Sequence, residues 1–183
     1  MQEIKGKNVI IRDGELVRRE AENRAYLMSL TNDNLLFNFR LEAGRFSGRS
    51  IPDDAHGGWE SPVCQMRGHF LGHWLSAAAI HYYKTGDMEL KAKADFIVDE
   101  LAKCQEDNGG QWVGPIPEKY LYWIAKGKPV WAPQYNIHKI FMGLVDMYYY
   151  AKNEKALEIA DNFADWFFEW SGKYTREEFD NIL

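Results

Sequence analysis

Two histidines, His69 and His73, lie four residues apart in the segment 57–74, where this chain concentrates its chemically active side chains. On a helix, this spacing places both imidazoles on one face. Helical zinc ligands share the spacing, and a glutamate and a cysteine lie just upstream. Because Phe70 stands where a zinc metalloprotease carries its glutamate, we expect no metal at the pair. Two alternatives stay open: core histidines with local partners, or pocket histidines that bind a ligand hydroxyl.

Glu60 follows Trp59 in the turn before these histidines. A carboxylate against an aromatic wall has a raised pKa and suits general acid catalysis. A solvated loop carboxylate is the other interpretation, and the sequence does not separate the two. Gly68 and Gly72 form a second pair four residues apart. Since glycine costs about 1 kcal/mol relative to alanine inside a helix, we expect a neighbour or a ligand to approach closely there.

Helices must position these side chains. The residues over 63–84 and 133–152 are apolar or small nearly all round, which is typical of helices buried on most sides. The segments 87–104 and 154–170 each have one apolar and one charged face. The remaining expected elements are helices over 15–30, 32–41, 118–125 and 175–183, a short strand over 8–12 and a long loop over 45–62.

The apolar and amphipathic helices form a repeat. Ala94-Asp95 corresponds to Ala160-Asp161, sixty-six residues later. Each unit pairs an apolar helix with an amphipathic one, which predicts inner helices covered by outer helices. The expected fold is therefore all-α, a partial (α/α)6 toroid built of helical hairpins with a short N-terminal strand. The same period places His73 opposite His138, at the same end of two inner helices.

The bulk composition restricts the class of protein. With 183 residues and 46% hydrophobic content, the chain predicts one globular domain over 1–183. A net charge of −5 argues against nucleic-acid binding. Seven Trp and ten Tyr suit either a sugar-binding cleft or a plain aromatic core. No segment is long and apolar enough for a membrane span or a secretory signal. Cys64 and Cys104 match neither a metal nor a disulfide spacing, so we expect reduced thiols and a cytoplasmic protein.

Several of these motifs resemble one enzyme family. The stretch 67–77 (RGHFLGHWLSA), preceded by 57–60 (GGWE), resembles the signature of the β-L-arabinofuranosidase-type glycoside hydrolases, glycoside hydrolase family 127 and its relatives. The stretch 130–140 (VWAPQYNIHKI) is similar to the second inner-helix motif of that family, and 23–27 with 35–40 is similar to its opening helices. The resemblance covers nearly the whole chain in order.

The resemblance implies an (α/α)6 toroid and retaining hydrolysis of L-arabinofuranosides. In such enzymes a zinc-held cysteine thiolate is the nucleophile and a glutamate is the acid/base, all in the later part of the toroid. Cys64 and Cys104 do not match those ligands, and six hairpins do not fit into 183 residues. The chain therefore resembles the N-terminal part of such a domain. We expect no catalytic residue and no cofactor in this chain, with zinc expected in the full-length enzyme.

The resemblance also implies which residues contact the sugar. His138 matches the histidine of the family pocket that contacts arabinose. Five other residues match motif positions at the same pocket end, namely Trp59, Glu60, His69, His73 and Tyr135. The expected partner is an oligosaccharide or glycoside, with no nucleic acid and no membrane.

Two hypotheses of function follow from this pattern. In the first, the chain supplies sugar-binding residues of a glycoside hydrolase and is inactive alone. In the second, it is a stand-alone all-α carbohydrate-binding or interaction module without catalysis. The first predicts exposed inner-helix faces, with apolar residues such as Leu75, Phe141 and Val145, and self-association through them.

Overall fold

The computed structural model describes residues 9–45 and 51–180, and all regular secondary structure within these ranges is helical. Residues 9–12, where a strand was expected, have no regular structure, and Ile10 is 81% exposed. No neighbouring strand pairs with them in the described chain, while residue 8 lies outside it. The helices are α1 (Glu15–Ser29), α2 (Asn32–Glu42), the 3-10 turn η2 (Gly58–Glu60), α3 (His69–Thr85), α4 (Met88–Asp107), α5 (Lys119–Ile124), α6 (Pro133–Ala151), α7 (Glu154–Ser171) and α8 (Arg176–Asp180).

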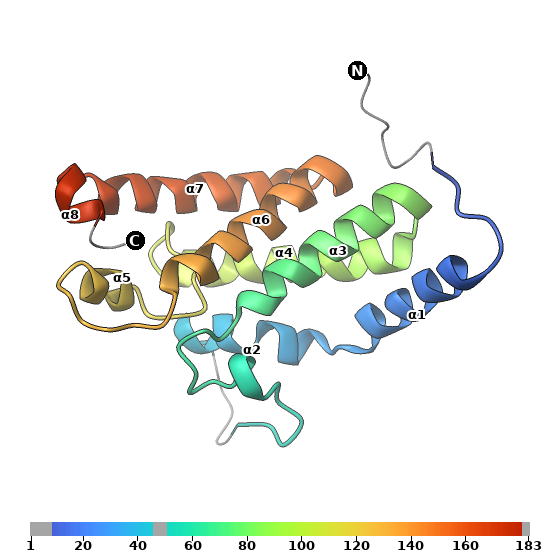
Figure 1. Ribbon diagram of the computed structural model, residues 1–183, viewed down its shortest axis with the longest axis horizontal. Helices are drawn as coiled ribbons and strands as arrows, with labels where there is room; N and C mark the ends of the chain where they lie inside the picture. Colours follow the sequence, from blue (N-terminus) through green and yellow to red (C-terminus); the bar gives the residue numbers. More distant parts are fainter. Residues whose placement is uncertain (1–8, 46–50, 181–183) are drawn as a thin grey trace.

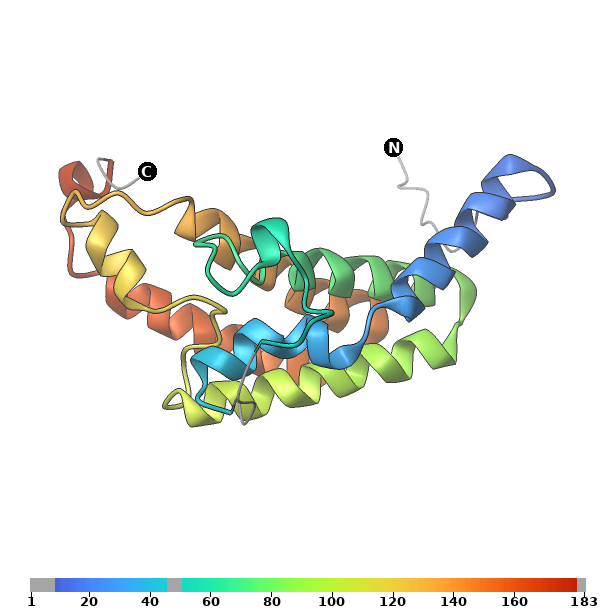
Figure 2. The same cartoon turned by 90° about the horizontal axis from the view of Figure 1, so that it is seen from below.

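The helices form two layers of hairpins. The inner helices α3 and α6 lie side by side and run in the same direction, while α4 and α7 run back along them (Figures 1 and 2). Helix α2 packs on α3 and α4. The core is one continuous cluster of apolar side chains contributed by both layers, with Trp74, Leu75 and Ile140 almost completely buried. The predicted all-α arrangement of paired inner and outer helices is confirmed.

The two inner helices touch through their backbones. A Cβ on Gly72 would lie 1.9 Å from the Lys139 carbonyl oxygen. A Cβ on Gly143 would lie 2.6 Å from the Gly72 carbonyl oxygen. Only glycine permits this approach, so the neighbour that the Gly72 position predicted is helix α6.

Helix α3 begins at His69, six residues later than expected. The preceding residues, 61–68, form successive turns instead. Gly68 has a φ of +83°, which favours glycine. A Cβ on it would also lie 2.2 Å from the Pro115 Cβ. The helix therefore starts where the backbone turns beneath a distant segment, a constraint that local sequence does not display.

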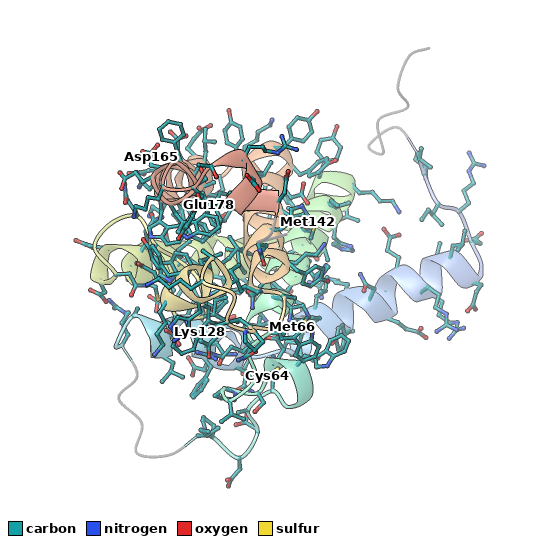
Figure 3. The ribbon with its side chains drawn as sticks, turned by 60° about the vertical axis from the view of Figure 1, so that its left-hand side comes forward. Cys64, Met66, Lys128, Met142, Asp165 and Glu178 are labelled. Atoms are coloured by element: carbon teal, nitrogen blue, oxygen red, sulfur yellow. The ribbon has the colours of Figure 1, made fainter. Side chains whose placement is uncertain are left out.

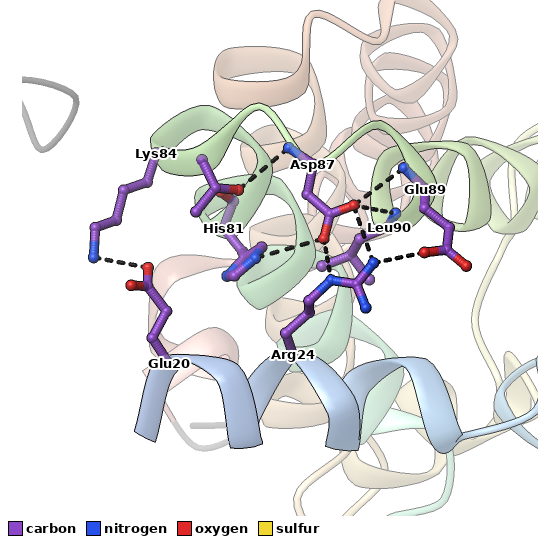
Figure 4. A network of polar contacts seen from close by, with 8 residues as sticks. Glu20, Arg24, His81, Lys84, Asp87, Glu89 and Leu90 are labelled. Carbon is purple, nitrogen blue, oxygen red and sulfur yellow. Dashed lines mark hydrogen bonds and ion pairs between the residues drawn. The ribbon is translucent and has the colours of Figure 1, made fainter. Parts of the chain in front are cut away.

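Helix α1 projects from the body and is tied to it by charged contacts (Figures 1 and 4). The Arg24 guanidinium donates to both Asp87 and Glu89 at the start of α4, at 2.5 Å and 2.6 Å. Lys84 at the end of α3 pairs with Glu20 at 2.8 Å. The outer surface of α1 stays open to solvent because these contacts use one side of the helix.

The expected exposure of inner-helix apolar residues is only partly met. Leu75 is fully buried, because it packs against Gly143 on the neighbouring helix. Phe141 is half-buried and stacks on Phe163 of α7, with ring centroids 4.8 Å apart. Val145 is 48% exposed, as predicted. Self-association stays a prediction, and Val145 is the residue of the three through which it could act. None of the helices in the described ranges has the length and apolarity of a membrane span.

Candidate functional site

Aromatic side chains gather where α3 and α6 begin. We call Trp59, His69, His73, Trp131 and Tyr135 the aromatic platform. Trp59 contacts Trp131 edge to face at 5.8 Å, and His69 lies 6.0 Å from Tyr135 and 6.1 Å from His73, measured between ring centroids. Three of the rings are strongly exposed, Trp59 at 60%, Trp131 at 48% and Tyr135 at 42%. Large aromatic rings left open to water next to imidazoles indicate a binding surface rather than a core.

His73 and Tyr135 join the two inner helices at the platform. The Tyr135 hydroxyl lies 3.5 Å from His73 Nε2. Lys139 places its ammonium 4.8 Å from the centre of the Tyr135 ring. Burial lowers the pKa of His73, and its neighbours Lys139 and His69 lower it further. A neutral imidazole at this place can both donate and accept a hydrogen bond.

Glu60 connects the loop to the start of α3. One carboxylate oxygen accepts the Gly68 N–H at 2.7 Å, and the other accepts the Phe70 N–H at 3.0 Å and lies 2.6 Å from His69 Nδ1. These N–H groups belong to the first turn of the helix, which has no partners of its own for them. Burial raises the pKa of Glu60, while those hydrogen bonds and His69 oppose the rise. The raised pKa agrees with the general-acid interpretation in direction, but the carboxylate is turned toward the helix start. It also borders a small cavity of about 190 Å³ lined by Tyr26, Leu30, His56 and Phe70.

A second layer of polar contacts holds the turns 61–68 against α6. The Gln65 side-chain oxygen accepts the Trp131 N–H at 2.8 Å. Asn136, fully buried, donates to the Arg67 carbonyl at 2.6 Å. Arg67 in turn pairs with Glu42 of α2 at 2.5 Å. Figure 3 shows this region, with Cys64 and Met66 in the turns before α3. Together these bonds fix the orientation of the two helix starts that carry the platform.

The structure brings together five of the six predicted sugar-contacting residues: Trp59, Glu60, His69, His73 and Tyr135. The sixth, His138, lies on α6 with an exposed side chain. No hydrogen bond or ring contact between described residues joins His138 to the histidines of α3. Its role stays a prediction.

Sequence reasoning missed one member of the platform, Trp131, and one neighbour of it, Lys139. Both lie inside the stretch 130–140 that carried the second motif, so the motif itself was the available signal. The position of Trp131 beside Trp59 depends on the hydrogen bond to Gln65, which joins segments sixty-six residues apart. Such a contact has no local signature.

Comparison with known families identifies the fold family. Residues 8–183 match the model described as the catalytic domain of β-L-arabinofuranosidase, glycoside hydrolase family 127. The chain belongs to this family. A search of curated proteins finds no match to it. The two stretches that resemble the family, 67–77 and 130–140, include the starts of α3 and α6, where the platform lies.

The family 127 chemistry implies a zinc–cysteine centre, and the cysteines present here do not fit one. Cys104 is buried in the core, and burial raises the pKa of its thiol to about 11. A thiol in that environment stays protonated, whereas zinc ligands and nucleophiles are thiolates. Cys64 lies in the turns before α3. Over the residues that the structure describes, no three His, Cys, Asp or Glu side chains converge in a way that could hold a metal.

Proposed function

We propose that this chain is the N-terminal part of a glycoside hydrolase that acts on L-arabinofuranosides or related plant-type glycans, and that it supplies the sugar-binding residues. One observation carries the proposal: exposed rings of Trp59, Trp131 and Tyr135 surround two imidazoles. Sugar rings have apolar C–H faces that pack on aromatic rings, while their hydroxyls need hydrogen-bond partners. The platform offers both within one surface.

We place the nucleophile and the acid/base outside these residues. The Cys104 thiol is buried and protonated, and Glu60 accepts two backbone N–H groups of α3. Neither group is free to attack or protonate a glycosidic bond. The role of this chain is then to bind and orient the sugar, with the zinc–cysteine centre supplied by a later part of the catalytic domain.

Binding of a simple sugar tests this function. Methyl β-L-arabinofuranoside should bind the purified chain in a calorimetric or NMR titration, and Trp59→Ala should weaken binding about tenfold because a stacking ring contributes about 1–2 kcal/mol. Phe168→Ala is the matched control, since Phe168 is 80% exposed on α7. Equal losses in both variants, or hydrolysis of an aryl β-L-arabinofuranoside by the chain alone, would contradict the proposal.

The alternative function is a stand-alone carbohydrate-binding or interaction module. It predicts a monodisperse protein that melts cooperatively and binds the sugar without cleaving it. The fragment proposal predicts association through exposed apolar side chains such as Val145 and Tyr149 of α6. Light scattering on the wild-type chain and on Val145→Asp distinguishes the two functions. The added carboxylate should break up an association through α6 and should leave a monomer unchanged.

A further inference from the structure

The buried surroundings of His69 determine which of its nitrogens carries the proton. Its Nδ1 lies 2.9 Å from the Met66 carbonyl oxygen and 2.6 Å from a Glu60 carboxylate oxygen. A carbonyl can only accept a hydrogen bond, so the contact with Met66 requires a proton on Nδ1 whether or not Glu60 is ionised. The proton of the neutral imidazole must therefore be on Nδ1, and Nε2 carries the lone pair.

From this geometry, the structure assigns Glu60 as a positioning residue that holds His69 in the Nδ1–H tautomer, so that Nε2 accepts a hydrogen bond from a ligand hydroxyl. The assignment rests on the proposed function only for the identity of that ligand. Free imidazole in water has no such restriction, so the buried acceptors select the tautomer.

Glu60 is itself held rigidly enough to do this. Its two oxygens are fixed by the Gly68 and Phe70 N–H groups, and its side chain is only 15% exposed. The same carboxylate therefore fixes where α3 starts and how the His69 ring is turned. The two roles are linked because Gly68, His69 and Phe70 are consecutive residues.

The arrangement also determines the chemistry of the ligand atom. The His69 side chain keeps 11% of its surface exposed, among the rings of Trp59, His73 and Tyr135. The unprotonated Nε2 presents a lone pair, and the Glu60 carboxylate lies on the Nδ1 side of the same ring. Both features attract a hydrogen-bond donor and repel an anionic oxygen. The site thus favours the hydroxyl of a neutral sugar at this position over the carboxylate of an acidic one.

Long-range ¹⁵N–¹H NMR of the chain with labelled histidine reads the tautomer directly, and His69→Gln identifies the signal. We expect wild-type His69 to be Nδ1–H near neutral pH. Glu60→Gln keeps the oxygen that faces Phe70 and His69 and should retain this tautomer, with arabinofuranoside affinity within about twofold of wild type, while its NH2 group opposite the Gly68 N–H should lower the thermal stability. Glu60→Ala leaves the Met66 carbonyl as the remaining acceptor for Nδ1–H, so the share of the Nε2–H tautomer should rise above that of the wild type and binding should weaken about fivefold, the effect of one lost hydrogen bond. Glu60→Asp, which withdraws the carboxylate by one methylene, is the second variant if Glu60→Ala does not fold.

A purely structural role for Glu60 gives a different result. Capping alone predicts lower thermal stability in the variants with an unchanged His69 tautomer. Glu100→Ala is the control, because it removes another buried carboxylate, on α4, and should leave the His69 signals unchanged. An Nε2–H tautomer in the wild type, or a full Nδ1–H tautomer in both Glu60→Ala and Glu60→Asp, overturns the assignment. If the wild type shows the expected tautomer but binds no arabinofuranoside, the proposed function fails and the assignment stands.

Discussion

The hairpins α3–α4 and α6–α7 have the same geometry and different means of attachment. In both, a polar side chain caps the outer helix: Asp87 accepts two N–H groups of α4, and Asn153 accepts the Ala156 N–H of α7. In both, the inner helix ends in a left-handed residue, Gly86 or Lys152. The repeat that the sequence predicts therefore includes the capping residues of the helices in both hairpins.

The outer helices differ in what holds them. Helix α4 is fastened by charges: Arg40 of α2 pairs with Glu100 at 2.6 Å, and Arg24 of α1 pairs with Asp87. Helix α7 is held by aromatic contacts, because the Trp112 ring lies 4.5 Å from Trp166 and 5.3 Å from Phe163 of α7 between centroids. Both outer helices bury an apolar face, including Leu90, Ile97 and Leu101 of α4, so the hairpins differ in the added ion pairs of α4 and the ring cluster of α7. Acid should affect the first, and cavities the second.

The largest effect is expected from removing Trp170, a buried ring at the C-terminal end of α7. Trp170 is 2% exposed and contacts Trp166, Phe167, Tyr174 and Phe179. Trp170→Ala should lower the free energy of unfolding by about 4 kcal/mol, the usual cost of a large buried cavity. Denaturant unfolding measures it. Phe168→Ala, on the exposed side of the same helix, should change stability by less than about 1 kcal/mol; a comparable loss there would contradict the attachment described.

A somewhat smaller loss is expected where the two hairpins meet. Gly72→Ala should destabilise the protein by about 3 kcal/mol, because its Cβ would overlap the backbone of α6 at Lys139 and Ile140. Gly57→Ala is the matched control, since a Cβ there would meet nothing within 4 Å. Thermal unfolding of both variants tests the contact, and a Gly72→Ala protein as stable as Gly57→Ala would show that the helices do not touch.

The ionisable cap of the first hairpin should confer a pH dependence that the second lacks. The hydrogen bond from Arg24 lowers the pKa of Asp87 below 3.8, although burial opposes this. A lowered carboxyl pKa adds stability that is complete above the unfolded-state value and is lost as the pH falls through the folded-state value. Asp87→Asn makes this cap resemble Asn153, so its loss of unfolding free energy between pH 7 and pH 3 should be smaller by about 1 kcal/mol.

Asn153→Asp is the reciprocal variant. It gives the second hairpin an ionisable cap without an arginine partner like Arg24. If Asp87→Asn and wild type lose the same stability on acidification, the charged attachment of α4 contributes nothing measurable.

The smallest effect concerns the platform itself. Burial first, then Lys139 and His69, lower the pKa of His73 below 6.5. Lys139→Met should raise the pKa of His73 in an NMR titration, because it removes one repelling charge. A lowered histidine pKa means that stability is lost as the pH falls from 6.5 through the folded-state value. Lys128→Met, next to Trp123, is the control and should leave the His73 titration unchanged.

Much of the helical architecture follows from the sequence, because burial patterns repeat locally. The apolar segments form α3 and α6, the amphipathic ones form α4 and α7, and the expected last helix is present as α8, with Thr175 and Glu178 as a capping pair at its start. The glycine at position 72 also predicted a close neighbour correctly. In each case the information lies within a few turns of one helix.

What the sequence did not reveal depends on contacts between distant segments. Helix α3 starts late because Gly68 lies under Pro115, and Glu60 caps that helix from the preceding loop. Leu75 is buried because α6 approaches so closely. The strand expected at the N-terminus failed because a β-branched run forms a strand only with a partner. For the platform, residue types pointed to the right end of the helices, while the pairing of Trp59 with Trp131 required the fold.

The backbone contact at Gly72 and Gly143 has a consequence for how the site tolerates change. The distance between His73 and Tyr135 is set by a main-chain contact: Gly72 directly precedes His73, and Lys139, whose carbonyl it meets, lies about one turn after Tyr135. Core side chains around α3 and α6 can therefore be exchanged for others of similar volume without altering the width of the binding surface. The contact between the two glycines therefore fixes the width of the binding surface, while side chains elsewhere in the core can be substituted.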